Sequence, residues 1–303
     1  MVRKSILTSV LGIPTDCSGR FTGVERMPGA LRKAGLVEKL EVRDSGNLAL
    51  KIDDPLRDKQ TGIIGFKQVC KVSNTICFEL TNLINQGEIP LLLGGCCTLL
   101  IGVAAALNES VEDFGLVFVD GHLDFYDGKS SPTGEAADMD LAILTGIGPR
   151  GLIDITGKVP LVRPDNIVVA GFRDAEQSMA DGAADPAVVF PGMKLYNAET
   201  LKKKGTGETS LEIKKQFENK SLKYWLHLDL DVLDEKVMPA VDYRMPGGLS
   251  WEDLRTLIQP IVRSPLLLGL DVTIFNPTLD TPDQLYAKQI VEFLSEILTV
   301  NQE

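Results

Sequence analysis

Short aliphatic or β-branched runs alternate along this chain with longer segments whose apolar residues recur at helical spacing. The short runs are typical of buried strands, and the longer segments of amphipathic helices. We expect strands at 5–12, 89–93, 115–120, 166–170, 187–190, 223–229 and 266–271. We expect helices at 28–35, 64–86, 98–108, 136–145, 174–181, 208–219, 250–263 and 281–299. This alternation predicts an α/β fold with three layers (α/β/α), a mostly parallel sheet, and one domain spanning residues 1–303.

Two of the predicted helices carry recognisable start signals. Pro28 can occupy the first turn of a helix that ends before Gly35. Ser250 is followed three residues later by Asp253, which is the pattern of a capping box. These signals support the helix boundaries read from the hydrophobic spacing.

Two hydrophobic stretches superficially resemble a signal peptide and a membrane-spanning helix. The stretch 5–13 follows two basic residues, as in a signal peptide, but hydroxyl residues break it and no convincing cleavage site follows. The uncharged run 91–107 approaches the length of a membrane helix. Because Gly94–Cys97 interrupts that run, we expect a buried strand, a tight turn and a buried helix. For 5–13 we expect a first buried strand.

The charge balance and the cysteine count narrow the class of protein. The formal net charge is −11, which argues against nucleic acid or an anionic membrane surface as a partner. The five cysteines are an odd number, which suits reduced thiols in the cytoplasm better than a disulfide framework. We therefore expect a cytoplasmic protein whose partner is neither nucleic acid nor a membrane.

Only two histidines occur in the chain, and each stands in a run where carboxylates alternate with it. The runs are Asp120-Gly-His-Leu-Asp124 and His227-Leu-Asp-Leu-Asp231. In a strand, residues i, i+2 and i+4 share one face, so each run directs an imidazole and two carboxylates to one place. Four aspartates on one surface would repel strongly unless a cation lies among them. The two runs therefore predict a metal site for more than one ion.

Three predicted strands lead into residues that can carry chemistry. The strand at 89–93 leads into Gly94–Cys97, the next strand ends on Asp120, and the strand at 223–229 ends on Asp229. In open α/β sheets, ligands bind beyond the carboxyl ends of the strands. We expect the three regions to converge on one edge of the sheet.

These motifs, in this order and with this spacing, resemble those of the ureohydrolase family, the arginases, agmatinases and formiminoglutamases. The family's second motif, Asp-Ala-His-x-Asp, is matched by Asp120–Asp124, with Gly121 in place of Ala. Its third motif, Asp-x-Asp-x-x-Asp followed by a Pro and a Gly-Gly pair, is matched by Asp229, Asp231, Asp234, Pro239 and Gly247-Gly248. The similarity extends from Gly12 to Pro277, nearly the whole chain.

The resemblance implies an arginase-like fold and two manganese ions, with a bridging hydroxide that attacks a guanidine-type or imine-type carbon. Carried over by position, Asp120 and Asp229 would each bridge both ions, Asp124 would bind one ion, and His122 and Asp231 would bind the other. Carboxylate-rich ligation with one imidazole independently suits Mn²⁺. Two adjacent dications also lower the pKa of a bound water toward about 7.

The activity that the resemblance implies is hydrolysis of a linear, non-peptide C–N bond in a guanidino, amidino or formimino compound. Asp124, as the acceptor of the transferred proton, and His122 are the catalytic candidates. The resemblance also implies a homotrimer or a homohexamer.

The family's first motif, Gly-Gly-Asp-His, differs in this chain. It reads Gly94-Gly95-Cys96-Cys97, so Cys97 takes the position of the family's histidine ligand and Cys96 replaces an acid. A thiolate ligand would bias the site toward Zn, Ni, Fe or Co. Alternatively, Cys97 is a small buried hydrophobe and the first ion is weak or absent. The sequence leaves both interpretations open.

Two positions on the substrate side also depart from the family pattern. Ala137 aligns with the histidine that shuttles protons in the family's arginases, and Ile274 aligns with their guanidinium-binding Glu. Without that carboxylate a cationic substrate loses a charge-assisted partner, so we do not expect arginine to be the substrate. Together with Cys97, these changes leave a rival interpretation open: a non-catalytic relative that acts as a partner subunit or a small-molecule binder.

A few further polar residues have two interpretations each. His227 stands one strand step before the metal aspartates, where the family places no ligand. We expect it to orient a neighbouring aspartate or pack in the core rather than bind metal. Glu135, Asp138 and Asp140 either supply an acid to the site or are solvated loop carboxylates. Arg173 either binds an anionic group of a ligand or forms an ion pair on the protein surface.

Overall fold

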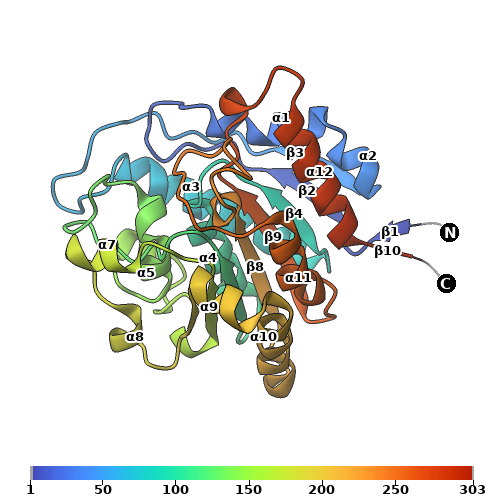
Figure 1. The fold of residues 1–303 in the computed structure, drawn as a ribbon. Helices are drawn as coiled ribbons and strands as arrows, with labels where there is room; N and C mark the ends of the chain where they lie inside the picture. Colours follow the sequence, from blue (N-terminus) through green and yellow to red (C-terminus); the bar gives the residue numbers. More distant parts are fainter. Residues whose placement is uncertain (1–2, 302–303) are drawn as a thin grey trace.

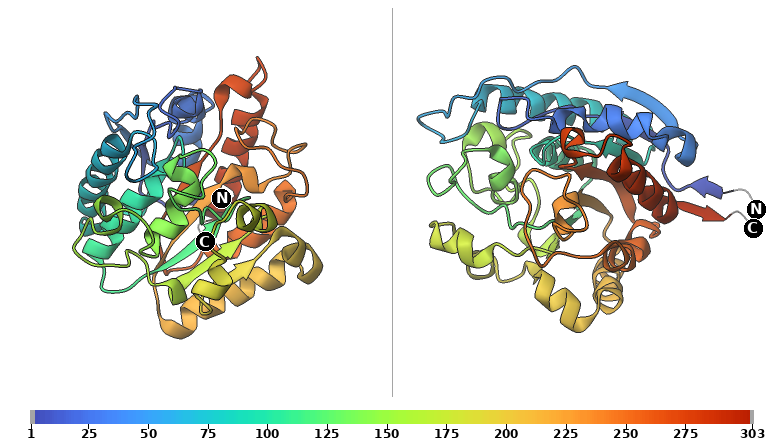
Figure 2. Two further views of the ribbon diagram at one scale, coloured as in Figure 1. Left: turned by 90° about the vertical axis from the view of Figure 1, so that its left-hand side faces the viewer. Right: turned by 45° about the horizontal axis from the view of Figure 1, so that its top comes forward.

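The computed structural model describes residues 3–301, and its centre is an eight-stranded sheet in which all neighbouring strands run parallel (Figure 1). In spatial order the strands are β3 (Arg43–Asn47), β2 (Ser9–Gly12), β4 (Pro90–Leu93), β9 (Leu267–Thr273), β8 (Tyr224–Asp229), β5 (Gly115–Val119), β6 (Ile167–Ala170) and β7 (Lys194–Tyr196). A separate antiparallel pair joins β1 (Arg3–Ser5) to β10 (Thr299–Asn301), and Figure 2 shows it beside the main body.

Helices cover both faces of the sheet, so the predicted three-layer α/β/α fold is confirmed. One face is covered by α3 (Phe66–Asn85), α4 (Leu99–Ser110), α5 (Asp140–Leu144) and α6 (Arg150–Ile153). The other face is covered by α1 (Met27–Lys33), α2 (Leu36–Leu40), α9 (Ala198–Lys204), α10 (Thr206–Lys220), α11 (Trp251–Val262) and α12 (Leu285–Leu298). The segment between β6 and β7 forms α7 (Ala175–Ala180) and α8 (Pro186–Val189).

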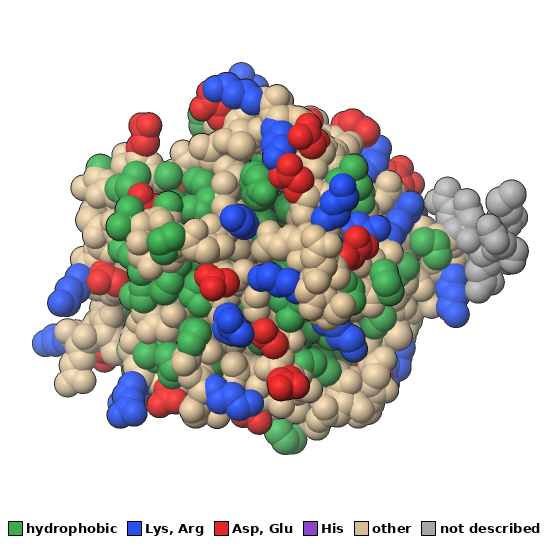
Figure 3. All heavy atoms as spheres, turned by 90° about the horizontal axis from the view of Figure 1, so that it is seen from below, with side chains coloured by type: hydrophobic (Ala, Val, Ile, Leu, Met, Phe, Trp, Pro, Cys, Tyr) green, Lys and Arg blue, Asp and Glu red, His purple; other side chains and the backbone are tan. Residues whose placement is uncertain are grey.

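The central strands are buried on both faces, which explains their unbroken hydrophobic runs. In β4, Leu91 and Leu93 pack into the layer of α10–α12, whereas Leu92 packs into the layer of α3 and α4. The uncharged run 91–107 accordingly forms β4, a turn and α4, as expected. Charged side chains of both signs are interspersed with apolar ones on the outer surface that Figure 3 presents. Among residues 3–301, none of the helices combines the length and the apolar character that crossing a membrane requires.

The predicted strand at 187–190 is wrong. Pro186 begins α8 instead, and the Asp185 side chain accepts a hydrogen bond from the Ala187 N–H, so local capping favours a helix. Val188 is 75% exposed, which a buried strand would not allow. The edge strand on this side of the sheet is β7, a few residues further along the chain.

Other differences concern short or polar elements. The pattern does not predict β3, because this edge strand is polar and exposed along its whole length. The expected strand 5–12 divides into β1 and β2, and the expected helix 136–145 divides into a 3₁₀ helix (Ala136–Met139) and α5. The helix expected at 281–299 begins only at Leu285. The short helices α2, α6 and α9 are not predicted either, because they offer too few turns for a periodic pattern.

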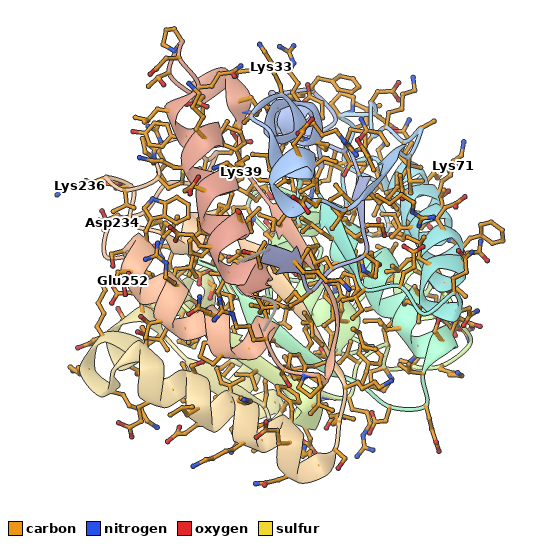
Figure 4. The ribbon with its side chains drawn as sticks, turned by 90° about the vertical axis from the view of Figure 1, so that its right-hand side faces the viewer. Lys33, Lys39, Lys71, Asp234, Lys236 and Glu252 are labelled. Atoms are coloured by element: carbon orange, nitrogen blue, oxygen red, sulfur yellow. The ribbon has the colours of Figure 1, made fainter. Side chains whose placement is uncertain are left out.

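The two helix-start signals are confirmed. Pro28 lies in the first turn of α1, and Ser250 and Asp253 form both hydrogen bonds of a capping box at the start of α11. Figure 4 shows Glu252, in the first turn of α11, and Lys71, on α3, on opposite sides of the sheet. The arrangement of the two helix layers leaves the carboxyl edge of the sheet to the loops that follow the strands.

Candidate metal centre

The loops that follow β4, β5, β8 and β9 meet at the carboxyl edge of the sheet, because these four strands are neighbours. Together with adjacent loops they enclose a cavity of about 650 Å³. All predicted ligands line this cavity: Cys97, Asp120, His122, Asp124, Asp229 and Asp231. Ala137 and Ile274 line it as well. The structure thus brings the three sequence regions together, while the ligand and catalytic roles of these residues stay predictions.

One group of possible ligand atoms forms around His122. Its Nδ1 lies 3.0 Å from Asp231 Oδ2 and 3.6 Å from Asp120 Oδ1. The loop that carries Asp231 is held by the Arg173 guanidinium, which donates to the Asp231 carbonyl at 2.7 Å. The Gly121 N–H donates to Asp231 Oδ1 at 3.0 Å. Among the described residues the Arg173 guanidinium forms no ion pair and donates to backbone carbonyls of the site loop, so the surface-pair interpretation is wrong. Binding of an anionic group by Arg173 stays a prediction.

A second group of possible ligand atoms contains Cys97, Asp120, His227 and Asp229. Cys97 Sγ donates a hydrogen bond to Asp229 Oδ2 at 2.6 Å, and His227 Nε2 lies 3.6 Å from Asp120 Oδ2. Asp120 therefore presents Oδ1 to the first group and Oδ2 to the second. This is the arrangement that a carboxylate bridging two ions requires.

Asp124 lies in the cavity but belongs to neither group. Its φ of 47° is in the left-handed region, which aspartate tolerates better than most residues. Burial raises the pKa of its carboxyl, and the negative charges of Asp120 and Asp140 raise it further. The assignments of Asp124 as a ligand and as a proton acceptor stay predictions.

Crowded carboxylates dominate the electrostatics of the centre. Burial raises the pKa of Asp229, and neighbouring aspartates add to the effect. Burial also raises the pKa of the Cys97 thiol, as do Asp229 and Asp120. Burial acts on Asp120 in the same direction, but the neighbouring imidazoles of His122 and His227 outweigh it and lower the pKa of that carboxyl. A divalent cation would favour the charged forms of all these groups, so the donor set fits a metal.

The interpretation of Asp140 as a solvated loop carboxylate is wrong. Asp140 is the first residue of α5 and is fully buried, and neither of its carboxylate oxygens has a hydrogen-bond partner among the described residues. A sequence signal for this burial exists, since four apolar residues, Leu141–Leu144, follow it directly. Asp138 and Glu135 also line the cavity, where Glu135 accepts hydrogen bonds from Cys17 and Tyr243.

The cavity wall is strongly anionic. Among the described residues that line it, Arg173 is the single basic residue other than histidine. Ten lining residues carry carboxyl groups, namely Asp16, Asp120, Asp124, Glu135, Asp138, Asp174, Asp181, Asp229, Asp231 and Asp242. A wall with ten carboxyl groups and one guanidinium is suited to hold cations.

Comparisons with known proteins agree with the fold and the motifs. The family model described as the arginase family matches residues 7–299. The chain is 26% identical over 286 residues to an arginase of Staphylococcus aureus (strain MSSA476), which covers 92% of each chain. It superposes on the structure of Bacillus subtilis arginase with a TM-score of 0.85 at 25% identity, over 98% of this chain and 99% of the other. The Bacillus caldovelox arginase structure has the same fold, with a TM-score of 0.86 at 24% identity over 98% of this chain and 99% of that one.

Proposed function

Because this chain belongs to the arginase family, we propose that it is a metal-dependent hydrolase of a linear, non-peptide C–N bond in a guanidino, amidino or formimino compound. The family supports hydrolysis of guanidino or amidino compounds in general. The proposal adds two divalent ions at the carboxyl edge of the sheet and assigns the residues that hold them.

The observation that carries the proposal is the position of Asp120. Its two carboxylate oxygens face two different groups of ligand atoms, one around His122 and one that contains Cys97. A carboxylate placed between two such groups is suited to bridge two cations. Asp229 adds a carboxylate to the group that contains Cys97, and Asp231 adds one to the group around His122. The carried-over ligand set differs at two positions, because it has Asp229 bridging both ions and Asp124 binding one of them.

Two bound divalent cations would lower the pKa of water toward about 7 and offset the negative charge of a tetrahedral intermediate. Asp124 accepts the transferred proton, because its carboxylate is buried in the wall of the same cavity. The further carboxylates of the wall, Glu135 and Asp16 among them, hold the cationic part of the substrate.

The substrate that we propose is not arginine. At the position of the family's guanidinium-binding Glu, this cavity presents the apolar side chain of Ile274, which is 5% exposed. A guanidinium group at this place would meet methyl groups instead of a carboxylate and would lose a charge-assisted hydrogen bond. The selectivity must then come from carboxylates elsewhere in the wall.

Manganese is the first candidate metal because of the family resemblance. Zn, Ni, Fe and Co are further candidates because the Cys97 thiolate would favour softer metals. We further propose a homotrimer or homohexamer, to be measured by light scattering coupled to size-exclusion chromatography. A cytoplasmic location is proposed because none of the five cysteines forms a disulfide in the structure.

The proposed function is tested by counting metal ions. The protein is purified under reducing conditions, supplied with Mn²⁺, Zn²⁺, Ni²⁺, Fe²⁺ or Co²⁺ in turn, and the ions per chain are measured beside those of Cys97→Ala. We expect about two ions in the wild-type protein and about one in the variant. A wild-type protein that binds no metal under any of these conditions contradicts the proposal.

Substrates are then sought by measuring urea or ammonia release from a panel of guanidino, amidino and formimino compounds. Release from one of them supports the hydrolase. Metal binding without release from any compound favours the rival interpretation, a non-catalytic partner subunit or small-molecule binder.

A further inference from the structure

His227 is held rigidly inside the sheet. It is fully buried on β8, and the strand register pairs it with Asp271 on β9. Its Nδ1 lies 2.5 Å from Asp271 Oδ2, and the other oxygen of Asp271 accepts a hydrogen bond from Trp225 Nε1 at 2.6 Å. The Trp225 indole packs over Gly269, where a Cβ atom would lie 2.4 Å from the ring. The orientation of the imidazole is thus determined by two strands.

This orientation directs Nε2 of His227 toward the metal centre. Nε2 lies 3.6 Å from Asp120 Oδ2, which is too long for a hydrogen bond, and neither atom has a hydrogen-bond partner among the described residues. Asp120 is 1% exposed and His227 is 0% exposed. Buried polar atoms without partners are rare in folded proteins because each destabilises the fold. A cation between the two atoms would satisfy both.

Two further ligand atoms face the same place. Cys97 Sγ, a carboxylate oxygen of Asp120, a ring nitrogen of His227 and a carboxylate oxygen of Asp229 all lie within 4.8 Å of one another. Ligand atoms around a tetrahedral zinc ion lie about 3.3–3.8 Å apart, given bond lengths of about 2.0–2.3 Å. The four atoms therefore need only small shifts to surround one ion.

Resting on the proposed metal centre, we propose that His227 binds the first ion through Nε2 and so supplies the imidazole that is missing at position 97. Cys97, Asp120, His227 and Asp229 then form a mixed thiolate, imidazole and carboxylate site for a divalent cation such as Zn²⁺ or Co²⁺. Asp271 orients the ring in the way that a carboxylate commonly orients a metal-bound histidine. The other ion, around His122, keeps the harder oxygen-rich set. The two positions thereby differ in metal preference.

The experiment uses Co²⁺, because a Co²⁺–thiolate bond gives a charge-transfer absorption in the near ultraviolet. Metal-free full-length protein is titrated with Co²⁺ under reducing conditions. We expect the band to appear with the first equivalent, to vanish in Cys97→Ser, and to stay unchanged in Cys77→Ser, whose thiol lies on α3. His227→Gln should weaken the binding of this ion on the order of 100-fold, and Asp271→Asn on the order of 10-fold to 100-fold.

A second measurement avoids changing His227, in case its variants do not fold. In His122→Gln, His227 is the one histidine left in the chain, so its ring ¹⁵N signals need no further assignment. One equivalent of Zn²⁺ should shift the Nε2 signal strongly and the Nδ1 signal much less.

Each negative result has its own meaning. Unchanged ring signals with one Zn²⁺ bound, or unchanged Co²⁺ affinity in a folded His227→Gln, overturn the inference and leave His227 as a partner of Asp271 alone. Metal bound only with His122, without a thiolate band, also overturns it but leaves the proposed function standing. A wild-type protein that binds no metal contradicts the proposed function itself.

Discussion

Ile274 adopts a backbone conformation that is unusual for its residue type. Its φ of 71° lies in the left-handed region, which β-branched residues strongly disfavour. The Ile274 N–H donates to the Gly95 carbonyl at 2.8 Å, so the loop after β9 is tied to the loop after β4. This strained backbone conformation lies in the wall of the cavity, at the position where the family's arginases have a substrate-binding carboxylate. Strain at such a place is typical of functional sites.

Changing Ile274 to Glu tests whether this position selects the substrate. A charge-assisted hydrogen bond to a guanidinium contributes about 1.5–3 kcal/mol, so we expect hydrolysis of arginine to rise roughly 10-fold to 100-fold over the wild-type level. Urea release from arginine is the measurement, and Ile274→Leu is the apolar control that should show no gain. Equal rates in the wild-type protein and a folded, metal-loaded Ile274→Glu would show that selectivity lies elsewhere.

Asp138, in the 3₁₀ helix Ala136–Met139, makes the stability of the folded protein depend on pH. Burial raises its pKa from 3.8 to about 6, although hydrogen bonds from Thr133 and Ser131 oppose the change. A carboxyl whose pKa rises on folding stabilises the fold fully below its unfolded pKa and loses this contribution as pH rises through about 6. The loss has an upper limit of about 3 kcal/mol, given about two pKa units at about 1.36 kcal/mol each.

Asp138→Asn removes the ionisation and keeps an acceptor for Thr133 and Ser131. We expect its melting temperature to exceed that of the wild-type protein at pH 8 and the difference to vanish near pH 4. Thermal unfolding of both metal-free proteins between pH 4 and pH 8 measures this. A difference that stays constant over the range would mean that Asp138 does not titrate as described.

At the scale of elements, the register between β8 and its neighbouring strands determines which partners the side chains of β8 contact. Trp225, His227 and Asp229 share one face of the strand, and the register places His227 beside Asp271 and Asp229 beside Thr273. The period of two along this run is visible in the sequence, and it correctly predicts that Asp229 reaches the carboxyl edge. The pairing with Asp271 is not visible in the sequence, because it depends on which strand lies next to β8 and in which register. For this reason sequence reasoning places His227 in a supporting role only.

The element whose start is best defined by local sequence is α11. The Ser250 side chain accepts from the Asp253 N–H at 3.1 Å, and the Asp253 carboxylate accepts from the Ser250 N–H at 3.1 Å. Ser250→Ala removes this cap, so we expect the free energy of unfolding to fall by about 1 kcal/mol. Chemical denaturation is the measurement, with Lys71→Ala on the exposed side of α3 as a control that changes stability by less than about 0.5 kcal/mol. A loss no larger than that of the control would show that the capping box contributes little.

At the scale of the whole molecule, the fold gathers negative charge at one place. The formal net charge is −11, and ten carboxylates line a single cavity. The metal-free protein must hold these groups together partly by keeping some protonated, since burial and mutual repulsion raise the pKa values of Asp124, Asp140 and Asp229. Bound cations would relieve the repulsion and link the loops after β4, β5 and β8.

Metal removal should therefore destabilise the whole protein. A ligand at 100 times its Kd stabilises the folded state by about 2.7 kcal/mol, which corresponds to roughly 4 °C in Tm for a chain of this size. Thermal unfolding with and without a chelator measures the difference. A variant that carries both Cys97→Ala and Asp231→Asn serves as the control, because it should respond little to the chelator. Identical Tm values for chelated and metal-supplied wild-type protein would contradict the expectation.

The sequence by itself determined the class of fold, the order of its main strands and helices, and the convergence of three strand ends. These features follow from local patterns: the two hydrophobic periods, the capping residues, and the rule that parallel strands end at one edge. The motifs at those ends also identified the family and the residues that line the cavity. Short or polar edge elements such as β3, β7 and α8 escaped prediction because local periodicity is weak there.

The tertiary structure alone decided how the centre is built in detail. It buried Asp140 without a hydrogen-bond partner among the described residues, turned Arg173 onto a backbone carbonyl, and left Asp124 outside both ligand groups. It also aimed Nε2 of His227 at Asp120. These outcomes depend on strand register and on packing between segments far apart in the chain. No local pattern records such contacts, because they arise only when the sheet assembles.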